Sequence, residues 1–150
     1  MNLIHGTAVV LGQAGLLLRG PSGSGKSDLA LRLIDEGARL VADDQVEIAR
    51  ESADIVMSAP PTIAGMIEAR GLGILRLPRA PRAALRLVCD LVSAADVERL
   101  PERRHATLLG ISVPLFVLCP FEGSAPTKLR FALQALAGDE LKTQAALIAP

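Results

Sequence analysis

Eight consecutive residues constrain this chain more than any other stretch, because they match the phosphate-loop pattern G-x-x-x-x-G-K-[ST] at every fixed position. They are Gly20, Pro21, Ser22, Gly23, Ser24, Gly25, Lys26 and Ser27. The short, mainly apolar stretch over residues 16–19, three leucines and Arg19, predicts a buried strand before this loop, and the leucines and isoleucine of residues 29–34 predict a helix that ends at Gly37. Strand, glycine-rich loop and helix is the order that phosphate binding requires.

The chemistry of such a loop follows from its backbone. Glycines let the N–H groups turn inward around a phosphate chain, and the N-terminus of the following helix adds a partial positive charge. The ammonium of Lys26 would reach the β- and γ-phosphates, and the hydroxyl of Ser27 would bind Mg²⁺. The sequence therefore predicts a site for a nucleoside triphosphate with Mg²⁺.

Composition limits the alternatives. The 150 residues suffice for one domain with its own core, so we expect a single domain over residues 1–150. Sixteen basic and sixteen acidic side chains cancel, and three phenylalanines are the only aromatic residues, which argues against nucleic acid or an anionic membrane as a partner. Cys89 and Cys119 lack C-x-x-C spacing, and no apolar run is long enough to span a bilayer. We expect buried free thiols and a cytoplasmic protein without a membrane segment.

The N-terminus holds a candidate site residue. A strand is predicted from Thr7, and a short turn at Gln13 leads back into the strand before the phosphate loop, as in an antiparallel hairpin. If the turn is centred on Gln13, Thr7 opposes Arg19 and His5 falls opposite Pro21, beside the loop. This register makes His5 a candidate, and a solvated terminal residue is the alternative.

Two acidic residues follow the next predicted strand, over residues 38–42. In phosphate-loop proteins, carboxylates in this position hold Mg²⁺ or position a nucleophile. Asp43 and Asp44 would point in different directions on an extended backbone, which allows two different roles. An aspartate-rich turn is the alternative.

A second unusual stretch begins at Glu68, after a hairpin predicted over residues 46–57. It continues to Gly73 with Arg70 at its entrance, and two glycines spaced two apart imply an irregular backbone of the kind where sites concentrate. A surface turn with a salt bridge between Glu68 and Arg70 explains these residues equally well.

The second half of the chain carries weaker sequence patterns. Strands are predicted over residues 85–92, 106–109 and 113–118, and closing helices over residues 127–136 and 141–148 with Thr127 and Asp139 as caps. Arg99 lies between these segments, where it could face solvent or a phosphate. The order is strand-rich with few helices, unlike a regular alternation of strands and helices.

Several separated pieces together resemble the catalytic domain of HPr kinase/phosphorylase, the bacterial enzyme that phosphorylates a serine of the phosphocarrier protein HPr. The pieces are His5-Gly6, the loop over residues 20–27, Ala42-Asp43-Asp44, and residues 68–74 with the pattern E-x-R-G-L-G-I. They span the first half of the chain in family order, and the last is the most family-specific. The resemblance implies an α/β, P-loop-containing, strand-rich HPr kinase/PEP carboxykinase-like core with few helices, in the short form with the kinase domain alone.

The resemblance also implies roles at the nucleotide. Lys26 and the loop would bind ATP, and Ser27 with Glu68 would hold Mg²⁺. Asp43 would support either the metal or Asp44.

The remaining implied roles concern transfer to the acceptor, an HPr-type phosphocarrier protein. Asp44 would be the general base toward its serine hydroxyl, and His5 would assist as a further catalytic residue. Arg99 sits where the family carries a catalytic arginine followed by a leucine. The family assembles as hexamers, so the resemblance also implies a homo-oligomer.

One loop departs from the family. Where the family has P-V-R-P-G-R-N, a loop associated with phosphorolysis and with subunit contacts, residues 118–126 lack both arginines and Glu122 adds a negative charge. The sequence therefore supports the kinase activity and gives phosphorolysis no support at this loop.

Two other functions fit a phosphate loop. The first is a small-molecule kinase, which would act on a metabolite without a protein acceptor. The second is a nucleotide-dependent regulatory switch without transferase activity, which would hydrolyse slowly and bind partners according to its nucleotide. Neither class requires the E-x-R-G-L-G segment.

Overall fold

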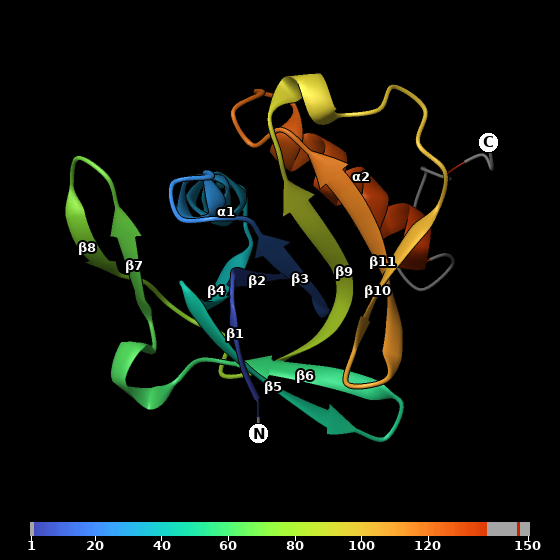
Figure 1. Cartoon of the computed structure of the whole chain (residues 1–150). Coiled ribbons are helices and arrows are strands. Elements are labelled where there is room, and N and C mark those ends of the chain that lie inside the picture. The colour runs from blue at the N-terminus through green and yellow to red at the C-terminus, as the bar shows by residue number, and fades with distance from the viewer. Residues whose placement is uncertain (1, 138–146, 148–150) are drawn as a thin grey trace.

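The structure is a computed structural model, and it describes residues 2–137 and 147 (Figure 1). Within these residues the helices are α1 (Lys26–Asp35) and α2 (Ala125–Ala137), with short 3₁₀ turns η1 (Pro61–Ile63) and η2 (Ala94–Asp96). The strands are β1 (Asn2–His5), β2 (Thr7–Leu11), β3 (Ala14–Arg19), β4 (Arg39–Ala42), β5 (Gln45–Glu51), β6 (Asp54–Ser58), β7 (Met66–Ala69), β8 (Gly73–Arg76), β9 (Ala83–Leu91), β10 (Arg104–Leu108) and β11 (Ile111–Leu118). The strand-rich α/β fold expected from the sequence is confirmed.

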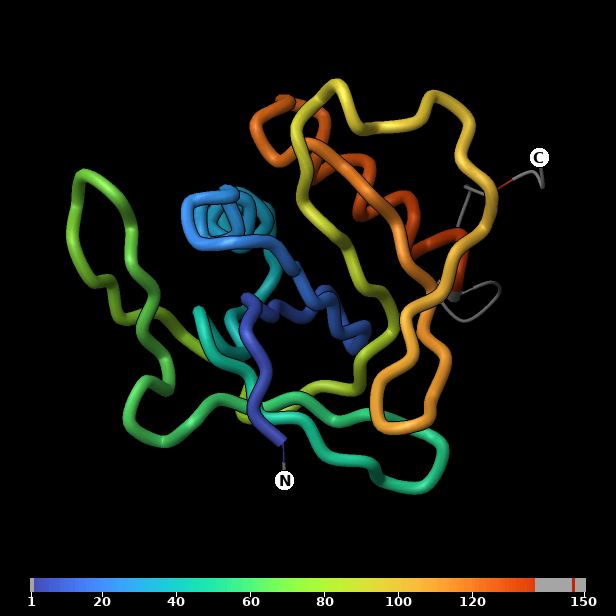
Figure 2. The backbone as a smooth tube through the Cα atoms, viewed as in Figure 1, coloured from blue at the N-terminus to red at the C-terminus, as the bar shows by residue number. Residues whose placement is uncertain are grey.

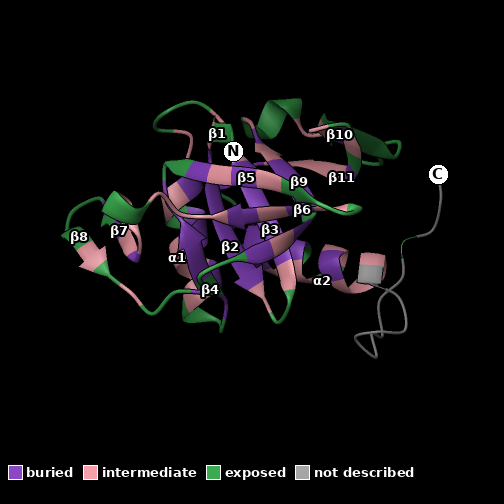
Figure 3. Cartoon of the chain, turned by 90° about the horizontal axis from the view of Figure 1, so that it is seen from below, coloured by how far each residue is buried: buried purple, intermediate pink, exposed green. Residues whose placement is uncertain are grey.

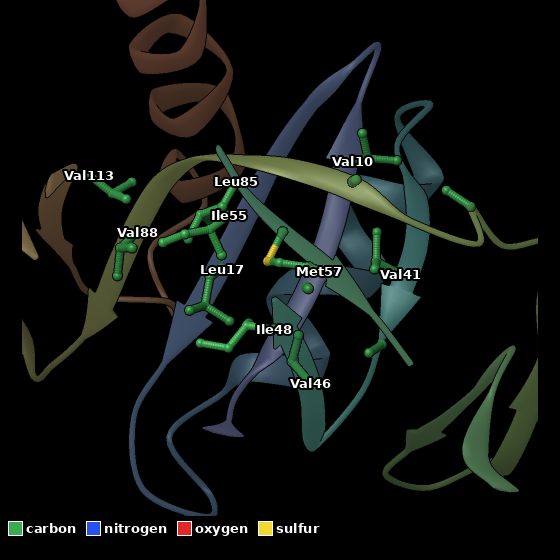
Figure 4. Packing of buried hydrophobic residues seen from close by; sticks show 14 of the residues in the cluster. Val10, Leu17, Val41, Val46, Ile48, Ile55, Met57, Leu85, Val88 and Val113 are labelled. Atoms are coloured by element: carbon green, nitrogen blue, oxygen red, sulfur yellow. The ribbon is translucent and has the colours of Figure 1, made fainter. Parts of the chain in front are cut away.

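Strand β9 joins two parts of one nine-stranded sheet. Its first residues pair antiparallel with β6, which is followed by β5 and β1. Its later residues lie between β3 and β11, both parallel to it, and the sheet continues through β2 to β4 on one side and β10 on the other. The sheet bends along β9, so that β5 and β6 lie across β2 and β3 (Figure 4).

The central strands are apolar at successive positions because both of their faces are buried. On β3, Leu17 packs between the two parts of the sheet together with Ile48 and Met57 (Figure 4). Its neighbours Leu16 and Leu18 pack in a second cluster, against α1 and α2 on the opposite face. These strands form the buried interior of the molecule (Figure 3), and the core is aliphatic as the composition predicts.

The carboxyl ends of four strands meet at one edge of the sheet. β3, β9 and β11 are parallel, and β4 shares their direction because both β3 and β4 pair antiparallel with β2. The phosphate loop follows β3, and the acidic pair follows β4. Ligands of α/β proteins bind at such an edge, so the functional site is expected here.

The β7–β8 hairpin is a two-stranded sheet of its own and stands out from the body of the molecule (Figures 1 and 2). Its base is attached through Ile67, which is fully buried in the cluster beneath the helices. Ile67 is followed directly by Glu68, so the same anchor holds Glu68 near the phosphate loop. The predicted irregular backbone is present at the tip, where Gly71 and Gly73 both have positive φ, of 92° and 111°.

The β2–β3 hairpin differs from its prediction by one residue. Thr7 pairs with Leu18 rather than with Arg19. The reason is that the turn contains two residues, Gly12 and Gln13, with Gly12 in the left-handed conformation at φ 61°. Two-residue hairpin turns favour such a conformation, and the expected centre at Gln13 was therefore wrong.

The closing segment is confirmed in part. Helix α2 is present, but Thr127 is not its cap because the helix begins two residues earlier, with the N–H of Lys128 donating to the carbonyl of Ser124 at 2.8 Å. The predicted cap Asp139 and the helix over residues 141–148 lie outside the described residues, except for 147.

The two cysteines are buried and form no disulfide bond, as expected. Burial raises the pKa of the Cys89 thiol to about 12, which keeps it protonated and unreactive. In the described part of the chain, neither helix has the length and apolar character needed to cross a bilayer.

Candidate functional site

The phosphate loop connects β3 to α1, as its sequence predicts. Gly25 is the N-cap of α1 and has φ 98°, a left-handed conformation that a side chain rarely adopts. A Cβ at this position would also lie 2.9 Å from Cγ of Pro120, so close packing and backbone conformation both require glycine. The first turn of α1 therefore starts at the loop, with its N–H groups directed toward the pocket edge.

Lys26 is folded back onto the loop. Its Nζ donates to the carbonyls of Gly20 at 2.7 Å and Pro21 at 2.9 Å, and the residue is 7% exposed. Burial lowers the pKa of the Lys26 ammonium, while the charges of Asp44 and Asp43 oppose that shift. Both carboxylates are therefore close enough to Lys26 for their charges to act on it.

Asp43 organises the interior of the site. Its carboxylate accepts hydrogen bonds from the hydroxyl of Ser27 at 2.7 Å, the hydroxyl of Thr7 at 2.9 Å and the backbone N–H of Glu68 at 3.2 Å. One buried side chain thus connects α1, β2 and β7. With its oxygens directed inward, Asp43 is placed to support the site rather than to meet an acceptor.

Asp44 faces outward instead. Its side chain is 69% exposed, and its Oδ1 lies 3.6 Å from Nδ1 of His5. The two aspartates do point in different directions, but the backbone at Asp44 is left-handed at φ 68° rather than extended as predicted. Aspartate tolerates this conformation better than most residues do, and the N–H of Gly6 donates to the Asp44 carbonyl at 3.0 Å, which holds the turn.

His5 reaches the site by a route that the hairpin argument missed. It pairs with Gln45 across β1 and β5, so its predicted position opposite Pro21 is wrong. Because Gln45 directly follows Asp44, this pairing still brings the imidazole beside the acidic pair.

Lys26, Ser27 and Asp44 line one pocket of ≈ 420 Å³ at the carboxyl edge of the sheet, while His5 and Asp43 lie beside it and are not lining residues. Its lining side chains come from the loop, α1, β2, the turn after β4, the β7–β8 hairpin and the segment after β11; they are Thr7, Ser22, Gly23, Gly25, Lys26, Ser27, Asp28, Leu31, Asp44, Glu68, Arg70 and Phe121. Glu68 and Arg70, which belong to the family-specific segment, therefore share a pocket with the phosphate loop.

Arg99 is not among these lining residues. It lies on the exposed segment between η2 and β10. Its catalytic role stays a prediction from the resemblance.

Four lining residues were not predicted as site residues: Asp28 and Leu31 on α1, and also Thr7 and Phe121, whose contacts lie far away in the sequence. Thr7 looks like an ordinary strand residue, and its burial against Asp43 depends on the pairing of β2 with β4. Phe121 belongs to the loop that departs from the family pattern, but that departure concerns two missing arginines and Glu122 and gives no role to the phenylalanine ring. Neither residue carries a local sequence signal for its contacts.

The oxygen atoms at Ser27 and Asp43 suit Mg²⁺ in chemical type. A hydroxyl and a carboxylate lie side by side at the start of α1, with the carboxylate of Glu68 lining the same pocket. Among the described residues no three His, Cys, Asp or Glu side chains converge to form a complete metal site. The residues fit a Mg²⁺ ion that takes its other ligands from phosphate and water, as Mg²⁺ in nucleotide sites does.

Thr7 offers a test of the support beneath the site. We expect Thr7→Val to lower the free energy of unfolding by about 1.5–3 kcal/mol, because a buried charged acceptor loses one donor. Thr7→Ser, which retains the hydroxyl, is the matched control and should lose less. Urea unfolding measures both, and equal stabilities for valine and wild type would contradict the role given to this contact.

The profile described as the HPr Serine kinase C-terminal domain matches residues 1–127. The chain belongs to this family. A solved structure, the Hpr(Ser) kinase/phosphatase from Coxiella burnetii, superposes with a TM-score of 0.79 and 26% identity, covering 95% of this chain and 92% of that one. The fold expected from the HPr kinase resemblance is thereby confirmed.

Curated relatives in the HPr kinase family match a shorter stretch. HPr kinase/phosphorylase 1 of Oceanobacillus iheyensis is 49% identical over 75 residues, which cover 49% of this chain and 24% of that protein. The HPr kinase/phosphorylase of Geobacillus thermodenitrificans is 43% identical over 96 residues, 59% of this chain and 31% of that protein. The aligned segments thus span about a quarter to a third of these relatives.

Proposed function

We propose that this chain is a protein-serine kinase that uses ATP and Mg²⁺ to phosphorylate an HPr-type phosphocarrier protein in the cytoplasm. The observation that carries the proposal is the exposed Asp44–His5 pair, 3.6 Å apart, beside a pocket whose lining includes Lys26 and the phosphate loop. A base open to solvent next to a phosphate site suits an acceptor hydroxyl carried by another protein. Membership of the HPr kinase family supports the same reading.

The nucleotide would be held mainly by the loop. Its backbone N–H groups and the N-terminus of α1 favour the negative charge of the phosphates. Lys26 would exchange the carbonyls of Gly20 and Pro21 for the β- and γ-phosphates, since its ammonium now donates to those two oxygens. Transfer then depends on alignment and charge neutralisation more than on covalent chemistry by the protein.

Asp44 would act on the acceptor. Its carboxylate accepts the proton of the serine hydroxyl while that oxygen forms a bond to the γ-phosphorus, and the bond to the β–γ bridging oxygen breaks to release ADP. Nδ1 of His5 lies 3.6 Å from Oδ1 of Asp44, so a small movement would bring the two side chains into hydrogen-bonding distance. His5 would then keep the carboxylate oriented toward the pocket.

Ser27, Asp43 and Glu68 would hold Mg²⁺, which neutralises phosphate charge when bound. Asp43 already connects the other two residues, through the Ser27 hydroxyl and the Glu68 N–H. The proposal covers the kinase reaction alone. At the loop where the family carries two arginines, Glu122 lies 3.3 Å from Lys128 in an ion pair, and no cation of this loop lines the pocket among the described residues.

The decisive experiment is transfer of labelled γ-phosphate from ATP with Mg²⁺ to purified HPr-type carriers. The matched control is the same carrier with its regulatory serine replaced by alanine. We expect label on the first and none on the second. Label on neither carrier, with ATP still bound, would refute the protein kinase and favour a small-molecule kinase.

A further inference from the structure

Phe121 lines the pocket and has no role in the proposed mechanism. The chain has three phenylalanines and no tyrosine or tryptophan, and Phe121 is 70% exposed where a large apolar residue would usually be buried. Its ring lies against the phosphate loop, because a Cβ on Gly25 would come within 3.2 Å of its Cε1. Phe121 and Leu31 are the large apolar side chains in an otherwise polar lining. An apolar wall of this kind suits an apolar part of a ligand.

The segment that carries the ring is held in place by α1. Arg32 donates to the carbonyl of Pro120 and, at 3.2 Å, to the carbonyl of Glu122, so one guanidinium binds the residues on both sides of Phe121. The same guanidinium pairs with Asp28, one turn earlier on α1, at 3.1 Å. These contacts orient the backbone of the segment and leave the ring itself exposed to the pocket.

Phe121 and the acidic pair lie on opposite sides of the phosphate loop along the edge of the sheet. Reading across the sheet, the order β4, β2, β3, β9, β11 places the acidic pair two strands to one side of the phosphate loop. The segment with Phe121 follows β11, two strands to the other side. A triphosphate whose γ-phosphate lay near Asp44 would therefore extend its nucleoside end toward Phe121.

We propose that Phe121 is the platform on which the base of the bound nucleoside triphosphate stacks, and that Arg32 is the residue that positions it. The proposal rests on the nucleotide site of the proposed function. Stacking on an aromatic ring accepts any base, since every base has a π-face. The platform therefore predicts that ATP and GTP both bind more tightly than inorganic tripolyphosphate, which carries the same phosphates without a base.

The sharpest test uses the absence of tryptophan and tyrosine from the sequence. In F121W the introduced indole is the single strong fluorophore of the protein. We expect Mg²⁺–ATP to quench it and tripolyphosphate to leave it nearly unchanged, because the base stacks on the ring and phosphates do not. F131W is the matched control: Phe131 is an exposed phenylalanine on α2 that does not line this pocket, and ATP should not quench an indole there.

Affinity gives the second readout. We expect F121A to weaken ATP binding by about 5- to 100-fold and to change tripolyphosphate binding by less than about twofold. R32A should shift the ratio of the two affinities in the same direction while tripolyphosphate binding shows that the loop is intact. A merely structural role for Arg32 would weaken both ligands together.

The outcomes separate the two proposals. Wild-type protein that binds neither ATP nor tripolyphosphate would overturn the nucleotide site itself. Wild-type protein that binds both, with an unchanged affinity ratio in F121A, would overturn the platform and leave the kinase proposal standing. If F121A leaves the ratio of ATP to tripolyphosphate affinity unchanged but raises the KM for the carrier protein, Phe121 would be assigned to binding of the acceptor protein instead.

Discussion

Lys26→Ala is expected to reduce phosphate transfer by about 10²–10³-fold or more. Loss of one preorganised charge-stabilising donor costs about 10²–10³ in turnover, and Lys26 would stabilise the phosphates in both the ground state and the transition state. The structure adds a second effect: the carbonyls of Gly20 and Pro21 lose the ammonium that now holds them, at 2.7 and 2.9 Å. Labelled transfer from ATP measures the first effect, and urea unfolding of the free protein measures the second.

Lys128→Ala is the matched control for this change. It removes a lysine that is half-exposed on α2 and pairs with Glu122 at 3.3 Å, outside the lining of the pocket. We expect it to retain transfer and to change the unfolding free energy by no more than about 0.5 kcal/mol. A Lys26→Ala protein that is folded yet transfers phosphate at a rate close to wild type would remove Lys26 from the mechanism.

Asp44→Asn is expected to slow transfer by about 10²–10⁴-fold, the usual contribution of a positioned base. Nucleotide binding should be spared, because the Asp44 side chain is exposed and, among the described residues, donates or accepts no hydrogen bond with the phosphate loop. Asparagine also tolerates the left-handed backbone at this position, φ 68°, so the turn should persist. Single-turnover transfer and ATP titration together measure the two effects.

Asp43→Asn provides the contrast. Its amide would replace a carboxylate that accepts from Thr7, Ser27 and the N–H of Glu68, so we expect weaker Mg²⁺-dependent nucleotide binding and lower stability as well as lower activity. Near-normal transfer by Asp44→Asn would exclude Asp44 as the base. Equal loss of nucleotide affinity in both variants would contradict the separate roles that we propose, in which Asp43 supports the Mg²⁺ and nucleotide site and Asp44 acts as the base.

Local pattern explains why some of the site could be predicted from the sequence. The phosphate loop and α1 depend on glycines, one lysine and a helical apolar period, all within residues 16–37, and the structure places them as expected. The acidic pair follows a short apolar strand, and its proximity to Ser27 follows from the meeting of strand ends at one edge. These features need little knowledge of distant pairing.

Long-range pairing explains what the sequence could not provide. The approach of His5 to Asp44 depends on β1 pairing with β5, forty residues apart, and not on the hairpin next to it. Thr7 acquires its partner Asp43 across 36 residues. The contact of Phe121 with the phosphate loop depends on β11 being a parallel neighbour of β9. No local pattern encodes any of these three arrangements.

The bent strand β9 has a consequence for how the protein is made. β3, which carries the phosphate loop, is hydrogen-bonded to β2 early in the chain and to β9 much later, and Arg19 and Asp90 pair across 71 residues at 2.7 Å. Contacts this distant in sequence slow folding. During synthesis β3 therefore remains a half-paired strand until Leu91 has left the ribosome, so a nascent chain that ends earlier is exposed to aggregation and has no firm base for its phosphate loop.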